Sequence, residues 1–209
     1  MYSEPCTLNL LTMIYLASAS PRRQELLRQL GIEFDVMPSN ILEVREAGEA
    51  PAQYVTRVAG DKARWVAQLV KERGLPAHPV LGADTEVVLD GEILGKPENA
   101  AHGVDMLRRL AGRTHEVLSA VCVRHREKEY TALSTSRVTF RPLTPAEIGQ
   151  YWKTGEPAGK AGAYAIQGRA AAFIAKLEGS YSGVMGLPLY ELDNILKRLQ
   201  AKVPDTPEK

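Results

Sequence analysis

Apolar residues recur at helical spacing in five stretches of the chain, which indicates helices with one face turned toward a core. Pro51 opens the longest stretch and Gly74 follows its end, as is usual for the first turn and the C-terminal cap of a helix. Gly112 ends the next stretch in the same way. The predicted helices are residues 22–30, 51–73, 98–111, 144–154 and 188–200.

Short apolar runs between these stretches predict strands. The pair Asp90-Gly91 stands between two such runs and favours a tight hairpin turn. Helices between strands at the start and hairpins later predict an α/β fold, with a mixed central β-sheet flanked by helices. The predicted strands are residues 14–18, 32–37, 79–83, 86–94, 115–125, 129–140 and 172–177.

The two ends of the chain lack this pattern. Residues 1–12 precede the first strand, and residues 201–209 contain two prolines and mixed charges, so we expect two disordered tails around one domain over 13–200. The 209 residues are enough to bury a core, and the formal net charge of +1 provides no broad field that would draw the chain to nucleic acid or to an anionic membrane.

The sequence also predicts a cytoplasmic location. No apolar stretch approaches the roughly 20 residues that span a bilayer, and the N-terminus lacks the basic region of a signal peptide. Cys6 and Cys122 are far apart in the sequence, which favours free thiols in a reducing compartment.

Residues 18–23, Ser-Ala-Ser-Pro-Arg-Arg, join the first predicted strand to the first predicted helix. Ser20 suits the N-cap of that helix and Pro21 its first position. Arg22 and Arg23 have the wrong sign for the positive end of the helix dipole, so an anion bound among them and the free backbone N–H groups explains them best. This pattern indicates a phosphate site, and the alternative is two exposed surface arginines.

Lys62 and Asp84 are charged residues on otherwise apolar elements. Lys62 lies in the apolar stripe of helix 51–73, where its ammonium either extends along the helix into water or meets an anion in a cleft. Asp84 follows the apolar run 79–83, and α/β enzymes often place catalytic groups at the tip of a buried strand. The alternative for Asp84 is a turn residue that binds its own backbone.

Glu43 and Lys96 extend this set, although each alone is an ordinary loop residue. The chain has no G-x-x-x-x-G-K-[ST] loop, no G-x-G-x-x-G and no Cys/His zinc spacing, which excludes three common sites. Two arginines, two lysines and two acids instead supply donors for phosphate oxygens, carboxylates for a divalent metal and a group that deprotonates water. This set suits the hydrolysis of a triphosphate.

Four ordered motifs resemble those of the Maf family of nucleoside triphosphate pyrophosphatases, in the branch that acts on dTTP and UTP. They are LASASPRRQELL, GADTEVVLDGEILGKP, AGAYAIQGRAAAFI and EGSYSGVMGLPLYE, and the resemblance extends from Met13 to about Leu199. It implies a Maf/Ham1 (ITPase-like) α/β fold with a cleft between two lobes, a cytoplasmic location, frequent formation of a homodimer, and a divalent metal cation, Mg²⁺ or Mn²⁺, as cofactor.

The resemblance also implies roles for single residues. It implies that Asp84 is the proton acceptor and that Glu43 joins Asp84 near the metal. It assigns phosphate contacts to Ser20, Arg23, Lys62 and Lys96. It assigns substrate specificity to Arg22, Thr85 and Gln167.

The chain departs from the family pattern at three positions. Leu42 precedes Glu43 where the family often has an acidic residue, so one carboxylate near the metal is missing. Glu86 stands where an apolar residue is usual, and it either faces solvent or adds charge near the cleft. Gly183 stands where an Asn is common, which changes the contacts of its loop.

The sequence therefore predicts an enzyme in which water attacks the α-phosphorus of dTTP or UTP, to clear unwanted or modified pyrimidine nucleotides. One alternative is the sister branch that acts on N7-methyl-GTP. That branch has an aromatic residue at the position of Arg22, Gln at that of Thr85 and Glu at that of Gln167, so this chain does not match it. The other alternative is a nucleotide-binding regulator of cell division. The carboxylates of Asp84 and Glu43 disfavour it, because negative charge beside a triphosphate weakens binding.

Overall fold

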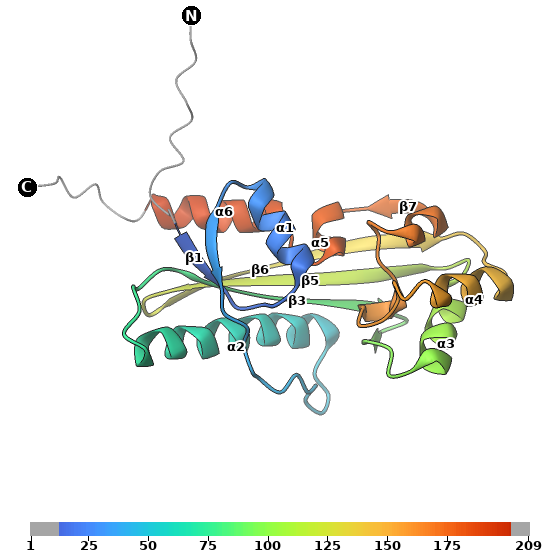
Figure 1. The fold of residues 1–209 in the computed structure, drawn as a ribbon, viewed down its shortest axis with the longest axis horizontal. Coiled ribbons are helices and arrows are strands. Elements are labelled where there is room, and N and C mark those ends of the chain that lie inside the picture. The colour runs from blue at the N-terminus through green and yellow to red at the C-terminus, as the bar shows by residue number, and fades with distance from the viewer. Residues whose placement is uncertain (1–12, 202–209) are drawn as a thin grey trace, which may run out of the picture.

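The computed structural model describes residues 13–201, which build a seven-stranded sheet with helices against both faces (Figure 1). The predicted tails, apart from Ala201, lie outside the described residues, as does Cys6. The strand order is β2-β1-β3-β5-β6-β7, and β4 pairs with β3 off this path. The strands are β1 (Met13–Leu16), β2 (Glu33–Val36), β3 (Val80–Leu89), β4 (Glu92–Leu94), β5 (Thr114–His125), β6 (Lys128–Phe140) and β7 (Ile174–Glu178).

All five predicted helices are present, with ends within two residues of the predicted ones. The short helix α5 and the two 3₁₀ segments η1 and η2 were not predicted, because helical segments of five residues or fewer are too short to show a helical period. The helices are α1 (Pro21–Gln29), α2 (Pro51–Glu72), α3 (Ala100–Leu110), α4 (Pro145–Lys153), α5 (Tyr181–Met185) and α6 (Leu189–Gln200), and the 3₁₀ segments are η1 (Ala161–Ala163) and η2 (Arg169–Phe173).

The sheet is mixed, as predicted. Strand β1 runs parallel to both β2 and β3, whereas β3, β5, β6 and β7 pair antiparallel. Strand β1 pairs with β3 at Val80 and Leu81, while β5 pairs with β3 as far as Val88. The middle of β3 is therefore held on one edge by β5, and on its other edge the neighbour β1 has already ended.

This pairing corrects the predicted break between strands 79–83 and 86–94. Asp84 lies inside the ten-residue strand β3 and not at its tip, because the antiparallel ladder with β5 carries the strand past it. The prediction that Asp84 ends a strand was wrong for the strand that contains it. Asp84 instead lies just beyond the carboxyl end of the neighbouring strand β1.

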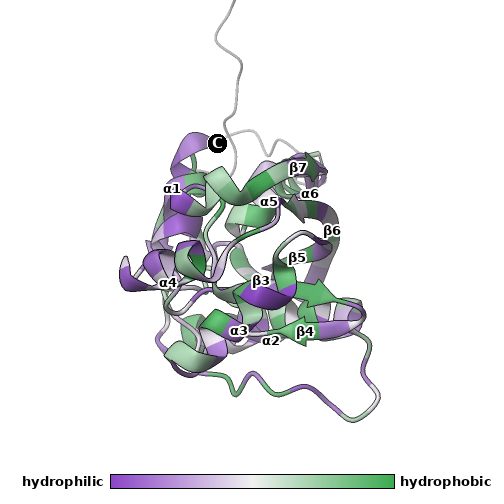
Figure 2. Cartoon of the chain, turned by 90° about the vertical axis from the view of Figure 1, so that its right-hand side faces the viewer, coloured by the Kyte–Doolittle hydropathy of each residue, from purple (hydrophilic) through white to green (hydrophobic). Residues whose placement is uncertain are grey.

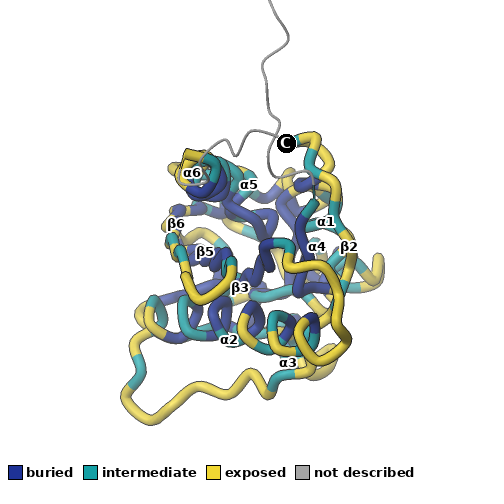
Figure 3. The backbone as a smooth tube through the Cα atoms, turned by 90° about the vertical axis from the view of Figure 1, so that its left-hand side faces the viewer, coloured by how far each residue is buried: buried dark blue, intermediate teal, exposed yellow. Residues whose placement is uncertain are grey.

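Helix α2 covers one face of β3 and β5, and α1, α5 and α6 cover the opposite face, with α3 and α4 at one end (Figure 1). Figure 2 shows α1 as largely hydrophilic, which suits an outer helix. Buried residues gather on the strands, whereas the long loop between β2 and α2 is exposed (Figure 3). None of the helices within residues 13–201 is long and apolar enough to cross a bilayer.

A close backbone approach sets the distance between α2 and β3. A Cβ atom added to Gly82 would lie 2.1 Å from the carbonyl oxygen of Ala59 and 2.8 Å from the backbone nitrogen of Ala63. Only a glycine fits there, so the helix rests directly on the strand. This contact brings Lys62 of α2 opposite Asp84 of β3.

The hairpin predicted at Asp90-Gly91 is confirmed. It joins β3 to β4, and Asp90 and Gly91 have φ angles of 52° and 80°. Positive φ at both central residues is the geometry of a type I′ turn, whose twist matches that of the paired strands. The hairpin returns the chain along β3 and brings the turn Gly95-Lys96-Pro97 toward the same region as Asp84.

Candidate active site

A cavity of about 720 Å³ opens beside β3 where β1 ends. It lies between the start of α1, helix α2, the turn after β4 and the segment around η1. The structure brings all the residues that the sequence analysis selected to the wall of this one cleft: Ser20, Arg22, Arg23, Glu43, Lys62, Asp84, Thr85, Lys96 and Gln167.

Lys62 and Asp84 form a buried ion pair at the floor of the cleft. The Lys62 ammonium lies 2.8 Å from Oδ1 of Asp84 and 3.0 Å from Oε1 of Glu43. Lys62 is 6% exposed and Asp84 is 4% exposed. The interpretation in which the Lys62 ammonium extends into water is therefore wrong. The second oxygen of Asp84, Oδ2, is buried without a hydrogen-bond partner among the described residues. A buried carboxylate oxygen in this state is ready to accept a proton or to bind a cation.

Arg23 joins three elements of the cleft wall. Its guanidinium donates to the carbonyl oxygen of Gly186 at 2.8 Å, to Oγ of Ser18 at 3.2 Å and to Oγ1 of Thr85 at 3.4 Å. Burial lowers the pKa of Arg23, and the charges of Asp84 and other nearby carboxylates partly offset this. These bonds tie the start of α1 to β3 and to the end of α5, so Arg23 has a structural role besides any contact with a ligand.

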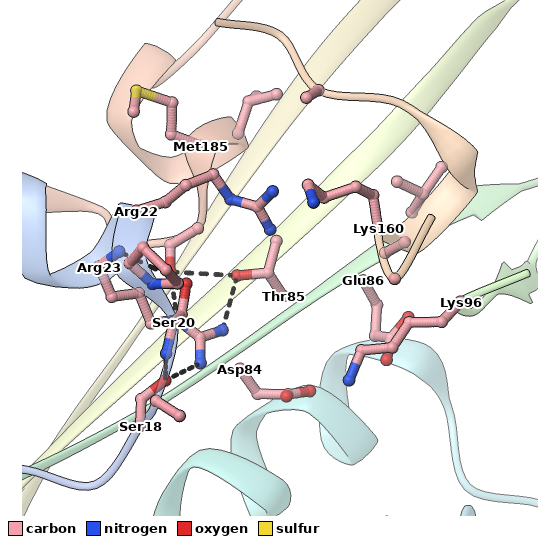
Figure 4. A pocket seen from close by; sticks show the side chains of 18 of the residues that line it. Ser18, Ser20, Arg22, Arg23, Asp84, Thr85, Glu86, Lys96, Lys160 and Met185 are labelled. Atoms are coloured by element: carbon pink, nitrogen blue, oxygen red, sulfur yellow. Dashed lines mark hydrogen bonds between the residues drawn. The ribbon is translucent and has the colours of Figure 1, made fainter. Parts of the chain in front are cut away.

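The start of α1 has the cap that the sequence predicts. The backbone N–H of Arg23 donates to Oγ of Ser20 at 3.5 Å, and Pro21 is the first helical residue. Arg22 points from this turn into the cleft (Figure 4), and its Nε is buried without a partner among the described residues. Burial lowers the pKa of Arg22, and the charge of Arg23 lowers it further.

Glu86 adds a third carboxyl group to the cleft, so the reading in which it faces solvent is wrong. It lines the cleft close to Lys96 (Figure 4), and its Oε2 is buried without a partner in the described part of the chain. Burial, and secondarily the charge of Asp84, raise the pKa of Glu86 to about 8. The raised pKa favours the neutral form of this carboxyl group, which limits the negative charge around Asp84.

The cleft has a charged end around Asp84 and an end, called the apolar end below, where Met185 lies on the same side of Thr85 as the cations Arg22 and Lys160. Lys62, Glu43 and Lys96 surround Asp84, whereas the side chains of Val117, Tyr164, Val184 and Met185 supply apolar wall elsewhere. Figure 4 shows Met185 and Asp84 on opposite sides of Arg22 and Thr85. A charged end suits a chain of phosphates, and an apolar end with a few polar groups suits a flat aromatic base.

Lys160 lines the cleft as well, and the sequence analysis did not select it. Its one signal in the sequence is its position as a lone lysine in a run of glycine and alanine, seven residues before Gln167. That signal is weak, because loop lysines are usually solvated.

Gly183 fits its position for a steric reason. A Cβ atom there would lie 3.1 Å from Cβ and 3.2 Å from Oγ of Ser180, whose side chain caps α5 by accepting from the N–H of Gly183. The glycine that departs from the family pattern therefore fits a tight space at this position. The N-terminal cap of α5 by Ser180 is intact.

The donor set fits a divalent cation that arrives with a phosphate. Among residues 13–201 no group of three or more His, Cys, Asp or Glu side chains surrounds one metal position. The Lys62 ammonium lies between the carboxylates of Asp84 and Glu43, which leaves Oδ2 of Asp84 as a free ligand atom beside them. Mg²⁺ often binds one or two carboxylates and completes its shell with phosphate oxygens and water.

The sequence comparisons with known proteins agree on one family. The sequence model of the family described as "Maf-like protein" matches residues 13–199. The dTTP/UTP pyrophosphatase of Methylococcus capsulatus is 54% identical over 190 residues, covering 89% of this chain and 90% of the relative. The proteins of the same description from Cupriavidus pinatubonensis and Alkalilimnicola ehrlichii are 50% and 52% identical, and each match covers 90% of this chain and 98% and 93% of the relative. Among solved structures, the Staphylococcus aureus Ham1 protein aligns with a TM-score of 0.49 at 11% identity, over 91% of this chain and 100% of that chain.

Proposed function

Because the chain belongs to the Maf family, we propose that it hydrolyses dTTP and UTP to the nucleoside monophosphate and pyrophosphate, in the cleft that Asp84 lines. It is a nucleotide pyrophosphatase, as are the relatives that share about half of its residues. Its role is to clear unwanted or modified pyrimidine nucleotides. The geometric observation that carries the proposal is the free Oδ2 of Asp84 at the charged end of the cleft.

Asp84 is the proton acceptor in this proposal. Lys62 holds Oδ1 at 2.8 Å, which orients the carboxylate and leaves Oδ2 without a partner among the described residues. A water molecule that donates a hydrogen bond to Oδ2 attacks the α-phosphorus as its proton passes to Asp84. The bond from the α-phosphorus to the bridging oxygen breaks, and the electron pair leaves with pyrophosphate.

The phosphate chain meets donors from three elements. Lys96 forms no ion pair with the carboxylates of the described chain, so its ammonium is available for phosphate oxygens. Ser20 and Arg23 offer donors at the start of α1, where the backbone N–H groups of the first turn also favour an anion. Lys62 contributes its charge from the floor of the cleft while it holds Asp84. Donors fixed in place before the reaction stabilise the charge that develops on the leaving pyrophosphate.

The pyrimidine ring occupies the apolar end, where Arg22, Thr85 and Gln167 contact it. The amide of Gln167 offers one donor and one acceptor, which match O4 and N3–H of uracil and thymine. Thr85 already donates or accepts within a network, because its Oγ1 lies 2.8 Å from Oγ of Ser119. That network fixes the side chain before a nucleotide binds.

We also propose that Mg²⁺ or Mn²⁺ acts as cofactor, held by Asp84 and Glu43 together with phosphate oxygens. Oδ2 of Asp84 would then serve both the cation and the attacking water through its two lone pairs, and the ion pair of Glu43 with Lys62 has to open or to turn. When bound, such a cation offsets the negative charge of the phosphates. A cytoplasmic location and a homodimer, both implied by the family resemblance, stay predictions.

The test is product analysis with a panel of nucleoside triphosphates, including dTTP, UTP, CTP, GTP and N7-methyl-GTP, each with Mg²⁺ or Mn²⁺. We expect pyrophosphate and a monophosphate, with dTTP and UTP preferred. In ¹⁸O-labelled water the label should appear in UMP, since attack at the α-phosphorus places the new oxygen there. Orthophosphate with a diphosphate product, or preference for N7-methyl-GTP, would contradict the proposal.

A further inference from the structure

Residues 156–170 form a closed loop that makes one wall of the cleft. The carboxylate of Glu156 accepts hydrogen bonds from the backbone N–H groups of Arg169 at 2.9 Å and of Ala170 at 3.4 Å, which joins the two ends of the loop. The hydroxyl of Tyr151 donates to Glu156 at 2.7 Å and accepts from the N–H of Ala165 at 3.2 Å. These bonds fix the two ends of the loop and its middle at Ala165.

The loop is also fitted against its neighbours. A Cβ atom added to Gly168 would lie 2.3 Å from the Glu156 carboxylate, so a side chain there would displace this carboxylate from its bonds to Arg169 and Ala170. At the other side of the loop, the N–H of Gly162 donates to the carbonyl oxygen of Gly95 at 3.1 Å, beside Lys96. The positions of Lys160 and Gln167 relative to each other, and to the charged end of the cleft, therefore follow from the loop.

Lys160 and Arg22 face each other across the cleft (Figure 4). The Lys160 ammonium has one hydrogen bond within the described chain, to the carbonyl oxygen of Ala158 at 3.3 Å, and Nε of Arg22 has none. Burial lowers the pKa of Lys160, and the charge of Arg22 lowers it further. Two cations opposed in this way are unfavourable unless a ligand brings an acceptor between them.

Of the two ends of a nucleotide, the base suits this region better than the phosphates, because the apolar Met185 lies on the same side of Thr85 as the two cations. In Figure 4 the Arg22 and Lys160 side chains and Met185 lie on one side of Thr85, and Asp84 lies on the other. With the α-phosphorus at Asp84, as proposed above, the ring at the apolar end comes within the region that Lys160 and Arg22 border.

Gln167 alone does not explain a preference for uracil over cytosine. The two bases differ at position 4, where uracil and thymine carry a carbonyl acceptor and cytosine carries an amino donor. A side-chain amide satisfies either pattern after a flip of its oxygen and nitrogen, whereas ammonium and guanidinium groups have donors and no acceptor. Discrimination at position 4 therefore needs a group that only donates.

We propose that Lys160 donates a hydrogen bond to O4 of the pyrimidine ring and so selects uracil and thymine against cytosine. This inference rests on the proposed function, since it places the base at the apolar end of the same cleft. Arg22 also has hydrogen-bond donors and no acceptor, and Lys160 supplies a further donor of this kind from the opposite wall of the cleft. Cytosine would bring its amino group against the ammonium, which leaves both donors without an acceptor.

The experiment compares Lys160→Met, Lys160→Gln and Lys160→Arg with the parent and with Lys153→Met, a change of the same kind at an exposed position of α4 outside the cleft. The first readout is the ratio of kcat/KM for UTP to that for CTP. The second is the ratio of Kd for CMP to that for UMP by isothermal titration. UMP and CMP carry the same phosphate, so their ratio reports the base alone.

We expect Lys160→Met to lower both ratios by about tenfold, the loss typical for one discriminating hydrogen bond. Lys160→Gln should lower them further, because an amide can turn its oxygen to the amino group of cytosine. Lys160→Arg and Lys153→Met should keep the ratios of the parent. Melting temperatures of all variants show whether any change is one of folding.

Three results would overturn the inference. Unchanged ratios in Lys160→Gln would remove Lys160 from base recognition. An equal loss for UTP and CTP, with weaker binding of inorganic pyrophosphate, would make Lys160 a phosphate ligand. A parent that binds UMP and CMP equally would leave no selectivity for Lys160 to explain. The proposed function fails separately, if the parent releases no pyrophosphate from any nucleotide.

Discussion

The Lys62 ammonium lies 2.8 Å from Oδ1 of Asp84, and both side chains are almost completely buried. A pair of opposite charges in this position stays stable only while each partner compensates the other. It also distinguishes the two oxygens of Asp84, because Oδ1 accepts from lysine and Oδ2 is left without a partner among the described residues. The pair therefore links the stability of the α2–β3 contact to catalysis.

Replacing Asp84 by Asn should lower kcat by about 10²-fold or more, the range typical for the loss of a general base. The amide keeps the size of the side chain, so a non-hydrolysable UTP analogue should still bind. Steady-state kinetics and calorimetry measure the two effects, with Asp105→Asn on the exposed surface of α3 as the control. Turnover within a few-fold of the parent would remove Asp84 from this role.

Replacing Lys62 by Met should cost both activity and stability. From the sequence, a phosphate-binding Lys62 would predict a loss of activity with little change in Tm, but the structure places two carboxylates against the ammonium. Their uncompensated charge should lower the free energy of unfolding by about 3 kcal/mol in urea titrations.

The double variant Lys62→Met/Asp84→Asn separates these effects. It removes the buried negative charge, so it should recover much of the stability while remaining inactive. If Lys62→Met alone were as stable as the parent, the pair would contribute little to folding.

Stability should fall below pH 6.5 because of His115. Burial lowers the pKa of this histidine to about 4, from 6.5 in an exposed chain, and its Nε2 lies 2.8 Å from the Tyr164 hydroxyl. As the pH falls from 6.5 toward 4, the unfolded chain binds a proton that the folded chain does not. The contribution is therefore fully present above pH 6.5 and is lost on acidification.

Urea unfolding at pH 7 and pH 5 measures this effect in the parent and in His115→Gln. The parent should lose about 2 kcal/mol more than the variant between the two values. His125, whose pKa is also lowered, remains in both proteins and cancels in the comparison. An equal loss in both proteins would show that His115 does not cause the acid sensitivity.

Replacing Gln167 by Glu should lower kcat/KM for UTP by about tenfold to a hundredfold, because a carboxylate places an acceptor against O4. The measurement compares dTTP, UTP, CTP, GTP and N7-methyl-GTP in the parent, in Gln167→Glu and in Gln150→Glu, which changes an exposed residue of α4 in the same way. A variant with the ranking and UTP value of the parent would show that Gln167 does not read the base.

Much of the fold could be read from the sequence because its signals are local. An apolar stripe, with a proline at its start and a glycine after its end, predicts helix α2, and Asp90-Gly91 predicts the hairpin. The continuation of β3 through Asp84 could not be read in this way, since polar residues interrupt the apolar run. The ladder to β5, a contact between segments distant in the sequence, decides it.

The candidate site likewise has features that the sequence determined and features that only the tertiary structure decided. Residue types and motifs alone determined that this chain belongs with nucleotide pyrophosphatases and which charged side chains to collect, because the chemistry of phosphate demands those groups. The tertiary structure decided what each one touches. It buried Lys62 against Asp84, placed Arg23 in bonds to Thr85 and Gly186, and brought Lys160 opposite Arg22. The reason is physical: which oxygen is free and which cation is unpaired depend on distances of a few ångströms between elements, and these are set by packing across the sheet.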